Sequence, residues 1–436
     1  MNSMNIKEVV ARQILDCKGR PAVEVDIVTE GGIMGRASAS TGTSVGENEA
    51  FVLRDNDPEV FEGLSVYNAI ENINKIIAPR IIGLDVSLQS TIDNIMIELD
   101  GTENKRKLGG NSIYAISLSC ARTAANALGK SLYRYLNPGE VNTIPVPTYN
   151  MINGGEYSKF SLAFQEFTLV PYKCTSIKEN VEVGTKVFYK LGKIIAEYQK
   201  ESRPSIGNYF AWAPPSDDPR VNFELLATAV KECGVEDKVG YAIDCASNEM
   251  YVSERGTYRY MGREIDRDEL IGRIKELSEE YNIIYIEDIV EENDWEGFVK
   301  ASKEINRSII IGDDFTVTNV DIIKKATEKK AIEGFVLKPN QVGTVTECMY
   351  AYEYANKNGL LIVPSIRAGG VVDDAVMEIA IALGAAACKN GCPRSGERIY
   401  ALNTLIRAEY ENPGAKPFDL YPFVRHHIES NERRGF

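Results

Sequence analysis

A regular alternation of short apolar runs and amphipathic stretches occupies the second part of the chain, and it limits the fold more than any other feature. Six runs are each followed by a helical pattern, and from the second run onward their polar last residues lie roughly 25 residues apart. This interval suits one strand, one helix and two loops, so the pattern predicts βα units around a parallel sheet. The longer first interval contains YVSERGTYRYMG around Gly256, where we expect an inserted hairpin. The predicted strands are Val239–Asp244, Ile283–Glu287, Ile309–Asp313, Gly334–Lys338, Leu360–Ser365 and Ala385–Lys389.

Two more strand patterns, Ile144–Tyr149 and Phe167–Val170, bring the number close to the eight of a (β/α) barrel. The chain has 436 residues, which exceeds the length at which a single core usually stops growing. We therefore predict an α/β fold whose C-terminal domain, residues 139–436, is a (β/α)8 TIM-type barrel.

The first part of the chain has a different pattern. Ile6–Leu15 and Pro21–Thr29 read as strands, and helical periodicity dominates from about residue 58 to residue 136. We predict an α+β domain over residues 1–138, ending at the Asn-Pro-Gly cluster. The polar stretch 38–49 is too poor in apolar residues to pack, so we expect a mobile loop in which Glu47 and Glu49 are solvated.

Composition excludes several classes of protein. The net charge of −14 argues against a broad nucleic-acid surface or an anionic-membrane surface, and the longest apolar run is too short to span a bilayer. Eight cysteines without a CxxC pair, and no secretory signal, favour reduced thiols in the cytoplasm. Only 2 histidines are present, which leaves little room for a histidine-rich metal site or a histidine-based nucleophilic triad.

Charged residues end five of the predicted strands. The carboxyl ends of barrel strands share one face, so these side chains should converge there. Three clustered carboxylates repel one another unless a cation lies among them, and hard oxygen ligands suit Mg²⁺. A lysine in such a site can act as a general base. The acids are Asp244, Glu287 and Asp313, and the lysines are Lys338 and Lys389.

The simpler interpretation is that each carboxylate only caps a helix or forms an ion pair in a loop. This interpretation suffices for a charged residue at one strand end, but it explains charged residues at five strand ends less well. Asp288 and Asp314, one residue further on, are the better candidates for such capping. Arg394 and Arg398, in KNGCPRSGER, are expected to form ion pairs in a loop or an interface.

Several segments resemble the enolase (phosphopyruvate hydratase) family over nearly the whole length. They include LDGTENK at 99–105, NMINGGE at 150–156, GDDFTVTN at 312–319 and LKPNQVGT at 337–344. The resemblance implies a capping domain, a modified barrel, two Mg²⁺ ions, a phosphorylated or phosphonate carboxylate as substrate, and a homodimer or higher homo-oligomer.

The resemblance also implies roles for individual residues. Lys338 matches the base, Lys389 the group that holds the substrate carboxylate, and Arg367 the group that holds its phosphate. Glu166 matches a glutamate near the leaving hydroxyl. The first metal site is implied for Asp244, Glu287 and Asp313, the second for Ser44 together with substrate, and further substrate contacts for Gln165, Ser365 and Tyr157.

The chain departs from the family pattern on one side of the implied site. Tyr157 and Ile366 stand where the family has active-site histidines, Tyr209 where it has a glutamate associated with loss of hydroxide, and Ala368 where it has a phosphate-binding serine. Every retained group serves the carboxylate, the metals or proton abstraction, whereas the altered groups contact the phosphate or the leaving group.

Three interpretations remain open. The favoured one is a Mg²⁺-dependent carbon–oxygen lyase (dehydratase) that stabilises an enolate but has an altered substrate or elimination step, for example of the carboxyphosphonoenolpyruvate synthase type, with Tyr209 as a candidate proton donor. The alternatives are an ordinary enolase acting on 2-phosphoglycerate in glycolysis, and an inactive enolase-like binding or scaffold protein.

Overall fold

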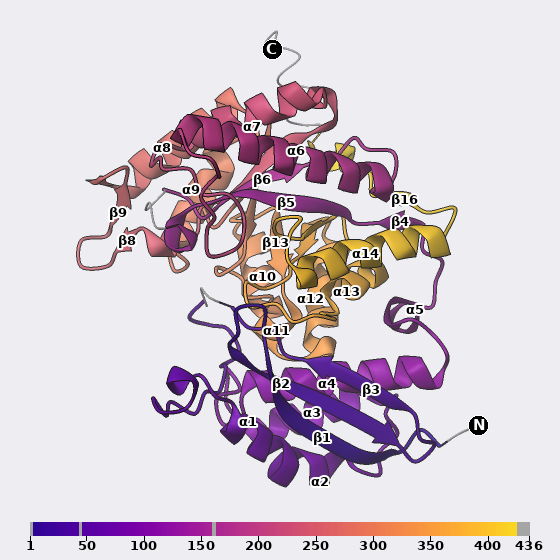
Figure 1. The fold of residues 1–436 in the computed structure, drawn as a ribbon. Coiled ribbons are helices and arrows are strands. Elements are labelled where there is room, and N and C mark those ends of the chain that lie inside the picture. Colours follow the sequence, from indigo (N-terminus) through magenta and orange to yellow (C-terminus); the bar gives the residue numbers. More distant parts are fainter. Residues whose placement is uncertain (1–2, 43–45, 159–162, 425–436) are drawn as a thin grey trace.

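The computed structural model describes residues 3–42, 46–158 and 163–424, which form an N-terminal unit below a barrel (Figure 1). The N-terminal unit has an antiparallel sheet of β1 (Ile6–Leu15), β2 (Pro21–Thr29) and β3 (Met34–Ser38), and the first two strands have the predicted bounds. Its first four α-helices lie on one side of this sheet, and the fifth lies between this unit and the barrel (Figure 1). The helices are α1 (Tyr67–Asn72), α2 (Ala78–Ile81), α3 (Gln89–Asp100), α4 (Gly110–Ala127) and α5 (Leu132–Leu136).

Eight strands form the barrel, in the order β14-β13-β12-β11-β7-β6-β5-β15, and an isolated bridge between Ser365 and Lys389 joins the two ends of this sheet. The strands are β5 (Val146–Asn153), β6 (Glu166–Val170), β7 (Gly240–Asp244), β11 (Ile283–Glu287), β12 (Ile309–Gly312), β13 (Gly334–Leu337), β14 (Leu361–Pro364) and β15 (Ala387–Lys389). The predicted barrel is confirmed.

The barrel sheet departs from the predicted parallel arrangement at β6, which pairs antiparallel with both β5 and β7. A parallel connection needs a crossover, usually a helix, and no α-helix lies in the described part of the β5–β6 connection. Two helices, α6 (Ile177–Gln199) and α7 (Pro219–Cys233), then lie between β6 and β7, and β7 begins at the end of the barrel where β6 ends, because Val170 pairs with Gly240.

The remaining barrel helices follow the strands in the predicted alternation. They are α8 (Arg267–Glu280), α9 (Trp295–Glu304), α10 (Val320–Glu328), α11 (Pro339–Val342), α12 (Val345–Lys357), α13 (Val376–Leu383) and α14 (Gly396–Glu411). The predicted insertion around Gly256 is a small sheet of β8 (Tyr251–Val252), β9 (Thr257–Tyr260) and β10 (Arg263–Ile265), and β4 (Thr143–Ile144) pairs with β16 (Lys416–Pro417). The domain boundary at residues 138–139 stays a prediction.

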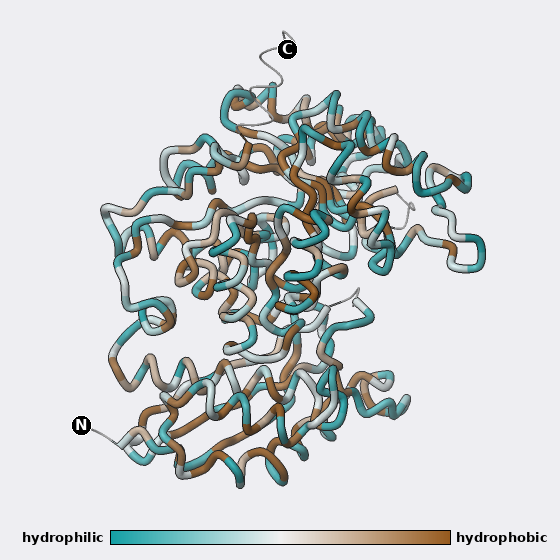
Figure 2. Tube along the Cα trace, turned by 180° about the vertical axis from the view of Figure 1, so that it is seen from behind, coloured by the Kyte–Doolittle hydropathy of each residue, from teal (hydrophilic) through white to brown (hydrophobic). Residues whose placement is uncertain are grey.

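Burial explains why these elements form. Every residue of β7, β11, β12, β13 and β14 is buried, as expected for barrel strands covered by helices, and hydrophobic segments lie inside both units (Figure 2). In β2, Val23, Val25 and Ile27 alternate with other residues and lie fully inside. All eight cysteines are free thiols, seven of them buried, as the sequence predicts.

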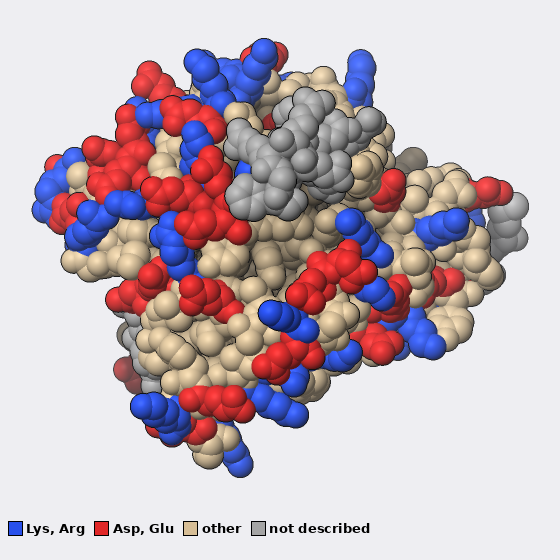
Figure 3. Space-filling model, turned by 90° about the horizontal axis from the view of Figure 1, so that it is seen from above, with Lys and Arg blue, Asp and Glu red and all other residues tan. Residues whose placement is uncertain are grey.

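Acidic and basic side chains are interspersed on the face seen in Figure 3, and no continuous basic field covers it. Within the described residues, no helix combines the length and the apolar character needed to cross a bilayer.

Candidate active site

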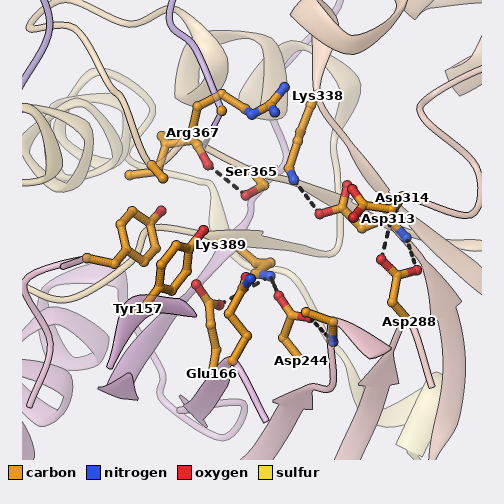
Figure 4. A pocket seen from close by; sticks show the side chains of 16 residues that line it. Tyr157, Glu166, Asp244, Asp288, Asp313, Asp314, Lys338, Ser365, Arg367 and Lys389 are labelled. Carbon is orange, nitrogen blue, oxygen red and sulfur yellow. Dashed lines mark hydrogen bonds and ion pairs between the residues drawn. The ribbon is translucent and has the colours of Figure 1, made fainter. Parts of the chain in front are cut away.

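Charged side chains gather at one end of the barrel because the strands deliver them there (Figure 4). Asp244 and Glu287 are the last residues of β7 and β11 and are register partners. Glu166 is the first residue of β6, and because β6 runs antiparallel to β7, it also pairs with Asp244. The reversed strand therefore adds a third carboxylate to the same end of the barrel.

Lys389, the last residue of β15, lies among these three carboxylates. Its Nζ is 2.7 Å from both carboxylate oxygens of Glu287, 3.2 Å from Asp244 Oδ2 and 3.2 Å from Glu166 Oε2. Burial by itself would lower the pKa of Lys389, but the surrounding negative charges outweigh burial and raise this pKa well above its ordinary value. Lys389 is therefore held as a buried ammonium.

The second lysine lies across the mouth of the barrel. Lys338 directly follows β13, and its ammonium forms an ion pair with Asp313, which directly follows β12. The other Asp313 oxygen accepts a 2.8 Å hydrogen bond from Gln341 Nε2. Burial opposes ionisation of Asp313, but Lys338 outweighs it and lowers the pKa of Asp313 to about 2. Asp313 is thus a carboxylate with two fixed donors.

The acid set fits a hard divalent cation. Carboxylate oxygens of Asp288, Asp313 and Asp314 all lie within 4.8 Å of one another. Burial, together with repulsion from neighbouring carboxylates, raises the pKa of Asp288 to about 8 and that of Glu287 well above its ordinary value. Crowded, buried oxygen donors of this kind suit Mg²⁺. Asp313 belongs both to this group and to the predicted metal-binding set, whose other members, Asp244 and Glu287, contact Lys389 here.

Asp288 also has the capping role that the sequence predicts. Its two carboxylate oxygens accept hydrogen bonds from the backbone N–H groups of Asp313 and Asp314, each at 2.8 Å. It fixes the turn after β12, and the sequence does not show that it would also approach the metal-binding group.

One cavity is lined by all the predicted site residues of the barrel except Glu287, which lies fully buried beneath it. Ser44, predicted for a second metal, lies outside the described residues. The same is true of the two histidines of the chain, His426 and His427. The predicted residues around the cavity are Tyr157, Gln165, Glu166, Tyr209, Asp244, Asp313, Lys338, Ser365, Arg367 and Lys389.

Comparisons with known proteins match the whole of this architecture. The family model "Enolase, N-terminal domain" matches residues 6–136, and "Enolase, C-terminal TIM barrel domain" matches residues 141–419. This chain belongs to the enolase family. The enolase of Thermococcus gammatolerans is 42% identical over 427 residues, which cover 97% of this chain and 98% of that protein. The enolase of Methanocaldococcus jannaschii is 41% identical over 406 residues, covering 93% and 95%, respectively.

The arginine that the enolase resemblance assigns to phosphate is tied to the N-terminal unit. Arg367 Nη1 lies 3.0 Å from Glu49 Oε2, and its Nη2 lies 3.1 Å from Glu49 Oε1. The prediction that Glu49 is solvated is wrong, because both side chains are 2% exposed. The sequence gives no local signal for this pair, whose members belong to different domains.

Apolar and aromatic groups form another part of the cavity wall. Tyr157, Tyr209 and Ala368 make a small buried cluster, and the two tyrosine rings lie with centroids 5.1 Å apart. Ile366 also lines the cavity. The resemblance to the family singles out these four positions, and all four line the same cavity.

Two predicted substrate contacts make hydrogen bonds within the protein. Gln165 donates from its side-chain amide to Glu249, and Ser365 Oγ donates to the carbonyl oxygen of Ile366 at 2.9 Å. Glu249 also accepts a 2.8 Å hydrogen bond from the backbone N–H of Glu156. Glu249 is a residue that the sequence analysis missed, and its position beside Gln165 depends on the turn after β7.

Proposed function

We propose that this chain is a magnesium-dependent hydro-lyase that converts 2-phosphoglycerate into phosphoenolpyruvate. The observation that carries the proposal is the arrangement of Lys338 and Lys389 among buried carboxylates at one end of an enolase-family barrel. Relatives about 40% identical over nearly their full length carry the name enolase, which favours the ordinary reaction over an altered one.

The residues of the chain have separable tasks in this reaction. Asp244, Glu287 and Asp313 would hold one Mg²⁺, and Ser44 would contribute to a second site together with substrate. Bound Mg²⁺ supplies positive charge that stabilises the dianion formed after the α-proton leaves. Lys338 accepts that proton at Nζ, and for this it must first lose its own proton.

Asp313 controls the protonation of Lys338. Burial lowers the pKa of Lys338, but Asp313 reverses the effect and raises it above the ordinary value. An Asp313 carboxylate engaged with a cation no longer neutralises the lysine, so burial and the other positive charges then favour the neutral amine. The shared carboxylate thereby couples metal binding to the availability of the base.

The remaining groups bind the substrate and assist the leaving group. Lys389 is a buried ammonium suited to a substrate carboxylate, and Arg367 offers a guanidinium for the phosphate. Glu166 lies beside Lys389, near the expected position of the leaving hydroxyl, and burial raises the pKa of its carboxyl group.

The test is the rise in enol-pyruvate absorbance after addition of 2-phosphoglycerate and Mg²⁺. We expect turnover that disappears in Lys338→Ala and on chelation of the metal. Lys330→Ala, an exposed lysine after α10, is the matched control and should retain full activity. A wild-type protein that binds Mg²⁺ but gives no phosphoenolpyruvate would contradict the proposal.

A second candidate is an enolate-forming dehydratase for a phosphonate analogue of 2-phosphoglycerate. The specific observation in its favour is the buried cluster of Tyr157, Tyr209 and Ala368, which together with Ile366 makes the cavity lining less polar. This candidate predicts slow turnover of 2-phosphoglycerate and faster turnover of the phosphonate. Loss of both activities and of Mg²⁺ binding would instead indicate a binding or scaffold protein.

The homodimer that the family implies is tested by light scattering.

A further inference from the structure

Arg398 lies directly behind the aromatic part of the active-site wall. It is fully buried, in the first turn of α14, and its guanidinium carbon is 4.1 Å from the centroid of the Tyr209 ring and 5.0 Å from that of Phe210. Arg398 does not line the cavity, whereas Tyr209 does. Arg398 therefore borders the cavity through Tyr209 rather than directly.

The position of Arg398 is costly for the fold. The N-terminal end of a helix carries partial positive charge, so a cation in the first turn is unfavourable. Nη1 is satisfied by Ser395 Oγ at 2.9 Å and by Glu397 Oε1 at 3.0 Å. Among the described residues, Nε and Nη2 have no hydrogen-bond partner. A buried donor without a hydrogen-bond partner destabilises the fold.

Gly391 lies beside both the guanidinium of Arg398 and the hydroxyl group of Tyr209. A Cβ atom added at Gly391 would lie 2.5 Å from Arg398 Nε and 3.3 Å from the Tyr209 hydroxyl oxygen. The arginine and the phenol hydroxyl thus approach one another across a space that a glycine leaves open. Gly391 also has φ +70°, a conformation that favours glycine.

The loop that carries Tyr209 is held by other contacts. The backbone N–H of Tyr209 donates to Asn153 Oδ1 at 3.2 Å, and Arg394 Nε donates to the carbonyl oxygen of Phe210 at 3.2 Å. Arg398 is therefore not needed to fix the loop backbone. Arg398 forms an ion pair with the neighbouring Glu397, as predicted for an arginine of this segment, whereas Arg394 hydrogen-bonds the carbonyl oxygen of Phe210 instead.

We propose that Arg398 is a positioning residue that holds Tyr209 as the proton donor to the leaving hydroxyl and stabilises the phenolate left behind. This inference rests on the proposed elimination reaction. When the carbon–oxygen bond breaks, its electron pair goes to oxygen, which takes the Tyr209 proton and leaves as water. The phenolate stays beside the guanidinium until solvent returns the proton, while the α-proton stays on Lys338 and is released later.

The acidity of Tyr209 is sufficient for this step. Burial raises the pKa of Tyr209 to about 12, and the charge of Arg398 acts against that rise. Water has a pKa of about 15.7, so proton transfer from the phenol to departing hydroxide is downhill. A neutral residue in place of Arg398 would leave the phenolate unpaired in a buried site.

The experiment separates proton abstraction from elimination. With 2-phosphoglycerate and Mg²⁺ in D₂O, deuterium incorporation at the α-carbon reports the first step, and phosphoenolpyruvate formation reports the second. We expect Arg398→Met and Tyr209→Phe each to reduce elimination by about 100-fold while exchange persists. Arg398→Lys should recover part of the loss, and the double variant should be no slower than Tyr209→Phe. Arg407→Met, on the exposed side of α14, is the matched control.

Each outcome bears on a different statement. Equal losses of exchange and elimination in Arg398→Met, or additive losses in the double variant, would overturn the role of Arg398 and leave the proposed function intact. A wild-type protein without exchange or elimination would overturn both. If Arg398→Met does not fold, Arg398→Lys replaces it in the double-mutant cycle with Tyr209→Phe.

Discussion

The guanidinium of Arg367 and the carboxylate of Glu49 form a two-bond ion pair across 318 residues of chain. Glu49 belongs to the N-terminal unit, and Arg367 follows β14 of the barrel. Both side chains are almost completely buried. This pair connects the loop of the capping domain to the residue that we expect to bind the substrate phosphate.

Replacing Glu49 with alanine should weaken the contact between the two units. Removing one partner of a buried pair leaves the other charge uncompensated, which typically costs about 3–5 kcal/mol. We expect a lower free energy of unfolding in urea for Glu49→Ala, with partial recovery in inorganic phosphate, which can pair with the freed Arg367. Glu47→Ala, at an exposed position in the same loop, should unfold like the wild type; equal stability of the two variants would contradict the prediction.

Replacing Lys389 with methionine should make stability depend strongly on Mg²⁺. Without the ammonium, Glu166, Asp244 and Glu287 repel one another, so the metal-free variant should have a lower Tm than the wild type. A bound Mg²⁺ ion would neutralise these carboxylates in place of the ammonium. At a Mg²⁺ concentration of about 100 times Kd, binding adds about 2.7 kcal/mol to the free energy of unfolding. Calorimetry with and without Mg²⁺ measures the change in Tm of both proteins. If Mg²⁺ raises the Tm of Lys389→Met no more than that of the wild type, the cation does not replace the lysine charge.

Glu249 should make stability pH-dependent near neutrality. Burial raises the pKa of Glu249 from its ordinary value of 4.5 to about 7, although hydrogen bonds from Glu156 and Gln165 oppose the rise. The fold favours the protonated form, so this contribution is complete below pH 4.5 and is lost as the pH rises to about 7. Relative to Glu249→Gln, which cannot ionise, the wild type should lose at most about 3 kcal/mol of unfolding free energy over this interval.

Chemical denaturation of the two proteins at a series of pH values checks the effect of Glu249. The exposed Glu254→Gln variant is the control and should follow the wild-type profile. Parallel profiles for Glu249→Gln and the wild type would show that Glu249 ionises normally.

Gly391→Ala should damage the active site more than an alanine at a comparable glycine. The new methyl group would meet Arg398 at 2.5 Å in addition to the strain of φ +70°. Gly262→Ala has φ +74° and nothing within 4 Å, so it has only the backbone cost of about 1–2 kcal/mol. We expect Gly391→Ala to lower both Tm and phosphoenolpyruvate formation below those of Gly262→Ala, and matching values would contradict the close packing around Arg398.

The amino-acid sequence by itself determined the barrel and much of its charged mouth. Short apolar runs and the recurring strand–helix interval can be read directly from the sequence. A barrel then brings its strand ends to one face. Asp244, Glu287, Lys338 and Lys389 could therefore be placed near one another without knowledge of the loops.

Only the tertiary structure decided which charges meet. The reversal of β6 places Glu166 beside Asp244, and the docking of the N-terminal unit buries Glu49 against Arg367. The same holds for Arg398, which reaches Tyr209 because α14 begins behind that loop. These contacts depend on strand direction and on the packing of distant loops, and no periodicity in the sequence encodes either.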